Sequence, residues 1–169
     1  IMKFLSILLL ILSFSFNVKA DVINNIIVNN NDRISLNTIK TYGNIEIGTD
    51  YSSDDLNNIL KNLYNTKFFK DVSLTIENQI LIIDIIENKL VQTVIIEGIK
   101  SSRVEEAILE GLTLKEKSPF VDSEISNDLA NIKKALTSQG YYFSYVSSKI
   151  EVNDNNTVNI FFNIDLGEK

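Results

Sequence analysis

The residue types that most often carry out catalysis are missing or scattered in this chain of 169 residues, which has no His and no Cys. Their absence removes the usual general base, the imidazole and thiolate metal ligands, and every Ser-His-Asp or Cys-His triad. The remaining candidates are three groups of carboxylates: Asp54-Asp55, Glu105-Glu106, and Asp122 with Glu124. A glycosidase would need two carboxylates facing each other across a cleft. Each group instead lies in or near a predicted helix, mostly near its N-terminus, where acidic side chains interact favourably with the helix dipole. We interpret them as capping and solvated residues, and we expect no enzyme, metal or cofactor.

Two aromatic runs are the other candidates for a binding site. They are Phe68-Phe69 and Tyr141-Tyr142-Phe143. Each run stands where a predicted helix gives way to a predicted strand, and we interpret both as core anchors at that transition. Because side chains alternate along a strand, one ring in each run should face outward.

The charge balance excludes one class of partner. The chain has 16 basic and 22 acidic residues and a formal net charge of -6. A nucleic-acid-binding domain normally carries a basic patch. We therefore expect no nucleic-acid partner.

The first 20 residues are typical of a secretory signal peptide. Lys3 gives a short positive region, residues 4–16 are apolar apart from three serines, and Val18-Lys19-Ala20 supplies compact residues for cleavage. The apolar run is shorter than the ~20 residues of a membrane-spanning helix, so a retained membrane anchor is the less favoured alternative. We predict cleavage between Ala20 and Asp21 and export. Because the chain has no Cys, we favour a bacterial periplasm over a disulfide-rich extracellular setting.

The rest of the chain contains the same pattern of elements twice. Each copy opens with an apolar strand that ends at a tight turn, at Asn30 and at Gly98, and both residue types tolerate a left-handed backbone. A short helix follows, and then a longer one with apolar residues at helical spacing. Each copy ends in a hairpin, and the nearly continuous apolar run of residues 80–86 marks the last strand as central or covered on both faces. We predict an α+β fold of two β-α-α-β-β modules, residues 21–89 and 90–169, each a three-stranded mixed sheet covered by two helices.

The helix boundaries can also be predicted. In the second copy Ile108 and Leu109 should face inward. The residues expected to cap the four helices are Ser35, Ser53, Ser102 in a capping box with Glu105, and Asp122.

Several short motifs, in this order, resemble those of the POTRA (polypeptide-transport-associated) family. Residues 28–34 resemble its strand-turn segment, residues 66–72 (TKFFKDV) resemble its T-G-F-F-x-D-V segment, and residues 140–143 (GYYF) repeat the latter. The stretch from Glu87-Asn88-Lys89 to Glu97-Gly98 resembles the linker and turn of the BamA-like assembly factors of the Gram-negative outer membrane. The resemblance covers all of residues 21–169.

The resemblance implies that the chain is the periplasmic part of an outer-membrane protein and is not an enzyme. Its implied partners are unfolded outer-membrane proteins, periplasmic accessory lipoproteins, and the outer membrane through a C-terminal β-barrel. The resemblance further implies that the barrel and additional POTRA domains follow the 169 residues.

The predicted topology also indicates how a client protein would bind. With the last strand of each hairpin central, the first lies at the sheet edge, where an extended segment can add its own backbone hydrogen bonds. The expected edge strands are residues 69–77 and 142–152. The expected client-binding residues are Phe69, Val72, Leu74, Ile76, Tyr142, Tyr145, Val146 and Ile150.

Other functions remain open at this point. A TamA-like factor or a two-partner secretion transporter would carry the same modules. A structural periplasmic or cell-division protein would carry one such module and keep a membrane anchor.

Overall fold

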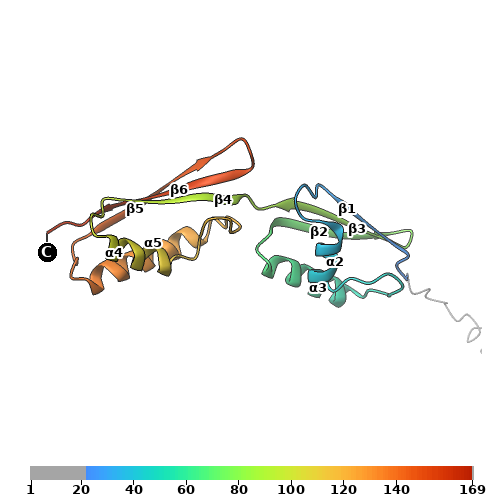
Figure 1. Ribbon diagram of the computed structural model, residues 1–169. Coiled ribbons are helices and arrows are strands. Elements are labelled where there is room, and N and C mark those ends of the chain that lie inside the picture. The colour runs from blue at the N-terminus through green and yellow to red at the C-terminus, as the bar shows by residue number, and fades with distance from the viewer. Residues whose placement is uncertain (1–21, 169) are drawn as a thin grey trace, which may run out of the picture.

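The computed structural model describes residues 22–168, which form two modules that follow one another end to end (Figure 1). The predicted signal peptide and its cleavage site at Ala20-Asp21 lie outside the described residues. None of the helices in residues 22–168 has the length and apolarity that a membrane crossing requires.

The first module has its last strand in the middle of a three-stranded sheet. Its elements are β1 (Asn25–Asn29), α2 (Leu36–Gly43), α3 (Ser53–Asn65), β2 (Phe69–Glu77) and β3 (Ile80–Glu87). Strand β3 is parallel to β1 and antiparallel to β2. The turn between β2 and β3 consists of Asn78 and Gln79, both with positive φ, which is the geometry that suits the twist of a tight hairpin.

The second module repeats this topology. Its elements are β4 (Leu90–Glu97), α4 (Ser102–Gly111), α5 (Glu124–Ser138), β5 (Tyr145–Val152) and β6 (Thr157–Asp165). Strand β6 is central, parallel to β4 and antiparallel to β5. The predicted α+β fold, with mixed three-stranded sheets and the last strand central, is confirmed.

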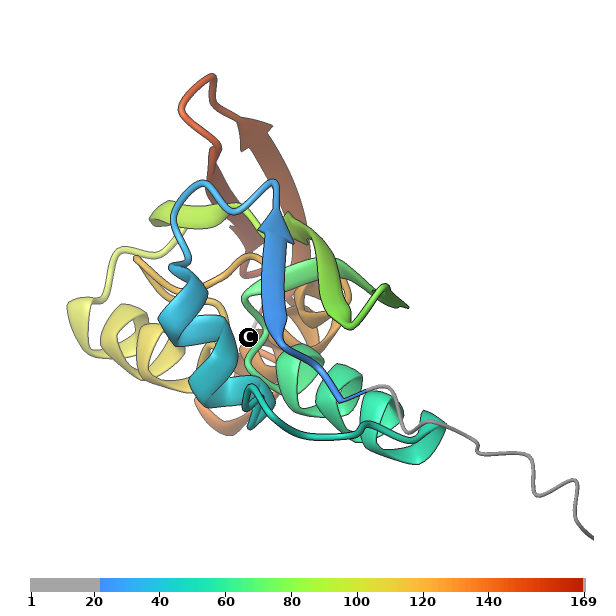
Figure 2. The same cartoon turned by 90° about the vertical axis from the view of Figure 1, so that its right-hand side faces the viewer.

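In each module the two helices lie on one face of the sheet (Figures 1 and 2). In the first module Ile59 and Leu63 of α3 pack in the same core as Ile83 of β3, and all three side chains are at most 3% exposed. Full burial of an aliphatic side chain of this size contributes about 1.5–3 kcal/mol. The other face of the sheet has no helix over it, and Ile86 of β3 is 54% exposed there. The apolar run of β3 therefore reflects a central position rather than cover on both faces.

The helices of the first module are capped by serine side chains. Ser35 caps α2 as predicted, and its hydroxyl accepts a hydrogen bond from the Thr38 N–H at 3.2 Å. Helix α3 begins one residue earlier than predicted, because Ser52 and not Ser53 is its N-cap. Ser52 forms a complete capping box with Asp55, whose carboxylate accepts from the Ser52 N–H.

The predicted caps of the second module are wrong. The Ser101 carbonyl accepts the first hydrogen bonds of α4, which places Ser102 inside the first turn, and Ser101 makes no side-chain cap bond. A turn at residues 122–123 precedes α5, so that Ser123 and not Asp122 stands at its N-cap. The predicted inward position of Leu109 is also wrong, since this side chain is 37% exposed, whereas Ile108 is buried.

Candidate functional site

The first sheet has β1 at one edge and β2 at the other. The backbone groups of β2 face alternately toward β3 and toward solvent. The Val72 N–H donates to the Tyr64 hydroxyl at 3.0 Å, so it points away from β3. Hydrogen-bonded and non-hydrogen-bonded pairs alternate along an antiparallel ladder. Leu74 and Ile76, at two-residue spacing from Val72, therefore also turn their backbone N–H and C=O groups outward.

The second sheet has β4 at one edge and β5 at the other. The register of β5 follows from the hairpin turn. The Asn153 N–H donates to the Thr157 carbonyl at 2.9 Å and closes the turn. The next pair, Val152 with Val158, is therefore a non-hydrogen-bonded pair, and every second pair after it is too. The residues of β5 whose backbone groups face outward are Val146, Ser148, Ile150 and Val152.

Five of the eight predicted client-binding residues lie at these outward-facing positions. They are Val72, Leu74 and Ile76 in β2, and Val146 and Ile150 in β5. Phe69 is 3% exposed and stands at the start of β2, before a register shift that ends at Asp71. Tyr145 pairs with Asp165 in a position whose backbone faces β6.

The eighth residue, Tyr142, lies outside the strand, and the predicted start of this edge strand is therefore wrong. Residues 141–144 form a turn, and the strand begins at Tyr145. The Lys133 ammonium holds the turn by donating to the carbonyls of Tyr142 and Ser144 and to the Ser144 hydroxyl. Tyr142 and Phe143 are consequently 65% and 74% exposed. The core-anchor interpretation fails for these two rings and holds for Phe69.

Both residues of the linker between the modules, Asn88 and Lys89, form hydrogen bonds. On the side of the first module, the Asn88 N–H donates to the Phe68 carbonyl at 2.8 Å and the Asn88 side-chain amide donates to the Lys67 carbonyl at 2.9 Å. On the side of the second module, the Lys89 carbonyl accepts from the Phe120 N–H at 2.7 Å. The two consecutive linker residues, Asn88 and Lys89, are thus bonded to different modules. This restricts the motion of one module relative to the other.

An ion pair joins the two modules beside this linker. The Lys67 ammonium lies 2.6 Å from a carboxylate oxygen of Glu124, and the two residues are 57 positions apart in the sequence. The hydrogen bond from Lys67, followed by one from Asn127, lowers the pKa of Glu124 below its ordinary value of 4.5. Both segments are recognisable in the sequence, but nothing in the sequence indicates this contact.

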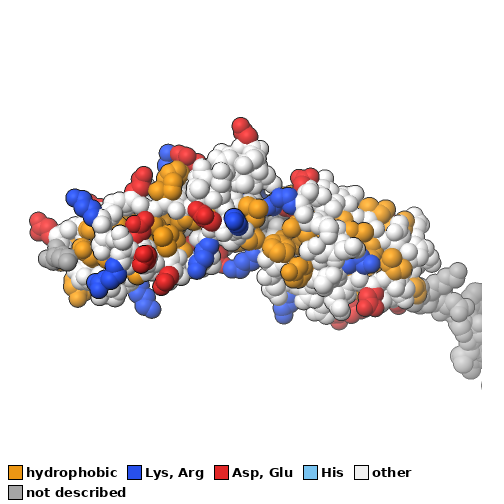
Figure 3. Space-filling view, viewed as in Figure 1, with side chains coloured by type: hydrophobic (Ala, Val, Ile, Leu, Met, Phe, Trp, Pro, Cys, Tyr) orange, Lys and Arg blue, Asp and Glu red, His pale blue; other side chains and the backbone are white. Residues whose placement is uncertain are grey.

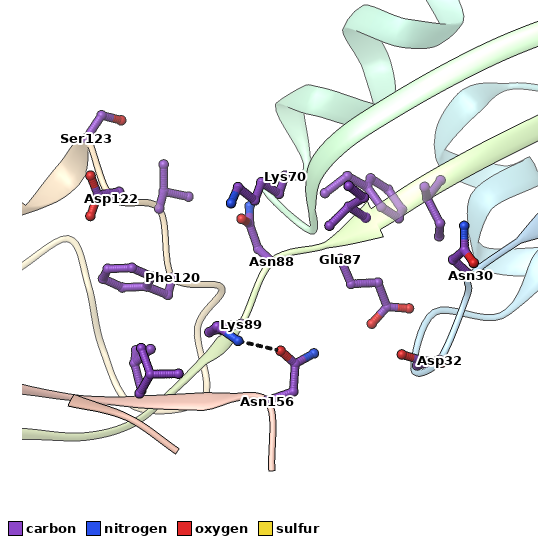
Figure 4. Close-up of a pocket in the computed structure, with 16 residues that line it drawn as sticks. Asn30, Asp32, Lys70, Glu87, Asn88, Lys89, Phe120, Asp122, Ser123 and Asn156 are labelled. Carbon is purple, nitrogen blue, oxygen red and sulfur yellow. Dashed lines mark hydrogen bonds between the residues drawn. The ribbon is translucent and has the colours of Figure 1, made fainter. Parts of the chain in front are cut away.

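A groove of about 770 Å³ lies between the modules (Figure 4). Phe69, Phe120 and Val152 contribute apolar surface, whereas Lys70 and Asp122 contribute charge. Lys89 closes one part of the groove by donating to the side-chain oxygen of Asn156 at 3.1 Å. The space-filling view shows hydrophobic side chains gathered where the modules meet, with basic side chains next to them (Figure 3).

The three carboxylate groups named in the sequence do not converge. Asp54 and Asp55 lie in the first turn of α3, the Glu105-Glu106 pair lies on α4, and Asp122 with Glu124 lies at the start of α5. Within residues 22–168, no three acidic side chains come together in a way that could hold a metal ion.

Comparison with known proteins finds one family model and one assembly factor to which this chain is similar. Residues 90–167, essentially the second module, match the POTRA family model, described as a surface antigen variable number repeat. The chain is 27% identical over 153 residues to the outer membrane protein assembly factor BamA of Neorickettsia risticii (strain Illinois). That match covers 90% of this chain and 20% of the relative. The chain therefore spans about a fifth of the length of this curated relative.

Two solved structures are similar to this chain. The N-terminal domain of Omp85 from Thermosynechococcus elongatus superimposes with a TM-score of 0.57 at 13% identity, over 86% of this chain and 63% of that chain. The first two POTRA domains of Omp85 from Anabaena match at a TM-score of 0.49 and 13% identity, over 88% of this chain and 96% of that chain. This chain consists of two POTRA-like modules that resemble the N-terminal region of BamA and Omp85, and, as predicted, that family is not enzymatic.

Proposed function

We propose that this chain is the periplasmic POTRA region of an outer-membrane β-barrel assembly factor. It binds unfolded outer-membrane proteins as added strands on the edges of its sheets, and it works with accessory lipoproteins. The similarity to BamA over 90% of the chain supports this assignment. We further propose that residues 1–20 are removed after Ala20 and that residues 21–89 and 90–169 are the two POTRA domains.

The outward-facing backbone of β2 and β5 is the observation that carries this proposal. An edge strand offers unpaired N–H and C=O groups to any extended segment, with little regard for its side chains. Outer-membrane proteins differ in sequence but share strands of alternating apolar and polar residues. Backbone recognition suits such a mixed set of clients.

The strength of one such contact is small. A net backbone hydrogen bond contributes about 1 kcal/mol, and a short added strand makes about four of them, which corresponds to roughly millimolar affinity. A single edge cannot hold a client, but several edges in series raise the effective concentration of the next one. Weak and repeated contacts allow a client to be passed on without being trapped.

The proposal is tested by NMR titration of the described region with a peptide from an outer-membrane β-strand. We expect backbone amide signals of residues 74–77 or 146–152 to shift with saturation at millimolar peptide. The control is the same peptide N-methylated at every second residue, which can no longer donate hydrogen bonds to the edge. If the unmethylated peptide shifts no signal on either strand at millimolar concentration, strand addition is rejected for this chain.

A further inference from the structure

We propose that the two edges are not equivalent: the side chains of Tyr64 and Asp71 close the first part of the β2 edge, so that an extended client segment pairs with β5. This inference rests on the strand addition proposed above and names the strand that performs it.

The closure of β2 consists of three hydrogen bonds around one backbone group. The Tyr64 hydroxyl accepts from the Val72 N–H at 3.0 Å and donates to the Asp71 carboxylate at 2.9 Å. The same carboxylate oxygen accepts from the Val72 N–H at 3.0 Å. The outward-facing N–H of Val72 is thus already paired within the first module.

The position of the hydroxyl also blocks a new strand sterically. Neighbouring strands lie about 4.8 Å apart, and an added strand would need the space beside Val72 that the Tyr64 hydroxyl occupies. The bulge between Phe69 and Asp71 bends the edge at the same point, since bulges interrupt the regular ladder. Only Leu74 and Ile76 remain available on β2.

Strand β5 is open along its whole length. Its four outward-facing residues are Val146, Ser148, Ile150 and Val152. Within residues 22–168, polar side chains beside the strand bond to other groups: Lys149 donates to the Glu151 carboxylate, Lys133 donates to the Ser144 hydroxyl, and Asn153 donates to the Thr157 hydroxyl. An added segment can therefore use twice as many residues on β5 as on β2.

The repeat explains why the second module lacks this closure. Tyr64 stands three residues before Lys67, which has positive φ, and Thr137 stands three residues before Gly140, which also has positive φ. Thr137 is too short to reach the sheet edge, and its hydroxyl donates to the Lys133 carbonyl of its own helix at 2.8 Å. The residue that closes β2 is absent from the matching place in the second module.

The surroundings of β5 favour an uncharged extended segment with an apolar end. Lys149 and Glu151 form an ion pair at 2.7 Å and neutralise each other along the strand. At the beginning of β5, Tyr142, Phe143 and Tyr145 are each at least 65% exposed and provide apolar surface for a side chain of the added segment. At the other end Val152 lines the groove between the modules.

The test uses an uncharged nine-residue peptide of alternating valine and threonine, with valine at each end and with acetylated and amidated termini, titrated into the two-module protein and followed by NMR. We expect saturable amide shifts in residues 146–152 at a peptide concentration at least about fivefold lower than for residues 74–76, since one net hydrogen bond changes affinity about fivefold. The double variant Tyr64→Phe with Asp71→Ala should strengthen binding at β2 by about fivefold or more and leave β5 unchanged.

A matched variant blocks the other edge. Ser148→Pro removes an outward-facing N–H without removing a ladder bond, a substitution that edge strands tolerate. It should abolish the shifts in residues 146–152 and leave those of β2 as they were. Amide hydrogen exchange gives a readout without peptide: the Val72 N–H should exchange at least tenfold more slowly than that of Leu74, and the difference should vanish in the double variant.

The outcomes separate this inference from the function on which it rests. Equal affinity at both edges of the unmodified protein, or a β2 edge that stays silent in the double variant while β5 binds, would overturn the closure but keep strand addition. The absence of shifts at both edges in every variant would overturn strand addition itself, and the closure with it.

Discussion

The backbone and the side chain of Arg33 are bound to the same carboxylate, that of Glu87. The Arg33 N–H donates to one oxygen at 2.9 Å and the Arg33 guanidinium donates to the other at 2.9 Å. The Ile34 N–H donates to the first oxygen as well, and the guanidinium also reaches the Asn88 carbonyl. This arrangement fixes the loop after β1 to the end of β3 and to the linker. The Glu87 side chain is 3% exposed and that of Arg33 is 32% exposed, so the carboxylate end of these bonds is shielded from water.

Replacing Glu87 should therefore destabilise the first module. In Glu87→Gln the carboxylate loses its charge and at least one of its acceptor positions, and a buried charge-assisted network of this kind is worth about 2 kcal/mol. Urea unfolding, followed by a probe in each module, should show a lower midpoint for the first module. Glu106→Gln, an exposed change on α4, is the control and should move neither transition. A Glu87→Gln protein that unfolds like the control would show that the network contributes nothing.

The ion pair between Lys67 and Glu124 should narrow the range of orientations that one module takes relative to the other. Lys67→Met removes the pair and keeps the stem of the side chain. Because Lys67 is half exposed, we expect little change in the stability of either module. The distance distribution between spin labels at Thr75→Cys and Glu116→Cys, which are the only thiols in a chain without Cys, should broaden. Lys149→Met removes an ion pair within the second module and should leave the distribution unchanged. An unbroadened distribution in Lys67→Met would mean that the linker contacts alone orient the modules.

The same junction should respond to acid. The Lys67 hydrogen bond holds the pKa of Glu124 below 4.5. The ion pair is therefore fully formed at neutral pH, and it still orients the modules at a pH near the ordinary pKa of a glutamate. Its contribution is lost as the pH falls through the lowered pKa, when Glu124 takes up a proton. The spin-label distribution should be constant from pH 7 to pH 5 and broaden only below about pH 4.5. In Glu124→Gln it should be broad throughout and lack this pH step, and a step of equal size in that variant would assign the effect to other carboxylates.

The order of elements could be predicted from the sequence because it depends on local periodicity. Ile59 and Leu63 recur at helical spacing, and residues 80–86 form an apolar run between two turn signals, so their burial follows from the pattern alone. The turn residues Asn30 and Gly98 were also predictable. Both have positive φ, 62° and 89°, as residues that tolerate a left-handed backbone should.

The functional contacts could not be predicted in this way, because they join segments that only the folded chain brings together. Tyr64 fits the apolar stripe of α3, and nothing local shows that its hydroxyl meets the Val72 N–H. Likewise, the sequence around Tyr142 has the composition of a strand. The hydrogen bonds from Lys133, nine residues earlier, keep it in a turn.

The capping box of α3 gives a test with a counterpart in the second module. The Ser52 hydroxyl accepts from the Asp55 N–H at 3.2 Å, whereas Ser123, at the matching place before α5, makes no side-chain cap bond. Ser52→Ala should destabilise the first module by about 1 kcal/mol, and Ser123→Ala should have almost no effect on the second. Both are measured as shifts of the unfolding midpoint of the module concerned. Equal effects would indicate a cost of the substitution itself and not of the lost cap.

Gly98 should be the least replaceable glycine of the second module. Its φ is +89°, and a Cβ at this position would overlap the carbonyl oxygen of Ile164 at the end of β6. Gly48 has nearly the same φ, +90°, but a Cβ there would meet no atom within 4 Å. Gly48→Ala should therefore cost only the backbone strain of about 1–2 kcal/mol. Gly98→Ala adds the overlap with a backbone atom that cannot move aside without breaking the sheet, and should cost about 3–5 kcal/mol.

Thermal unfolding of the two variants separates these costs. For Gly98→Ala we expect the second module to unfold well below the first, with loss of the amide dispersion of β4–β6 in NMR spectra at a temperature where β1–β3 remain intact. For Gly48→Ala we expect a small decrease confined to the first module. If both variants lost the same stability, the close approach of Gly98 to β6 would not matter, and the left-handed backbone alone would account for glycine at this turn.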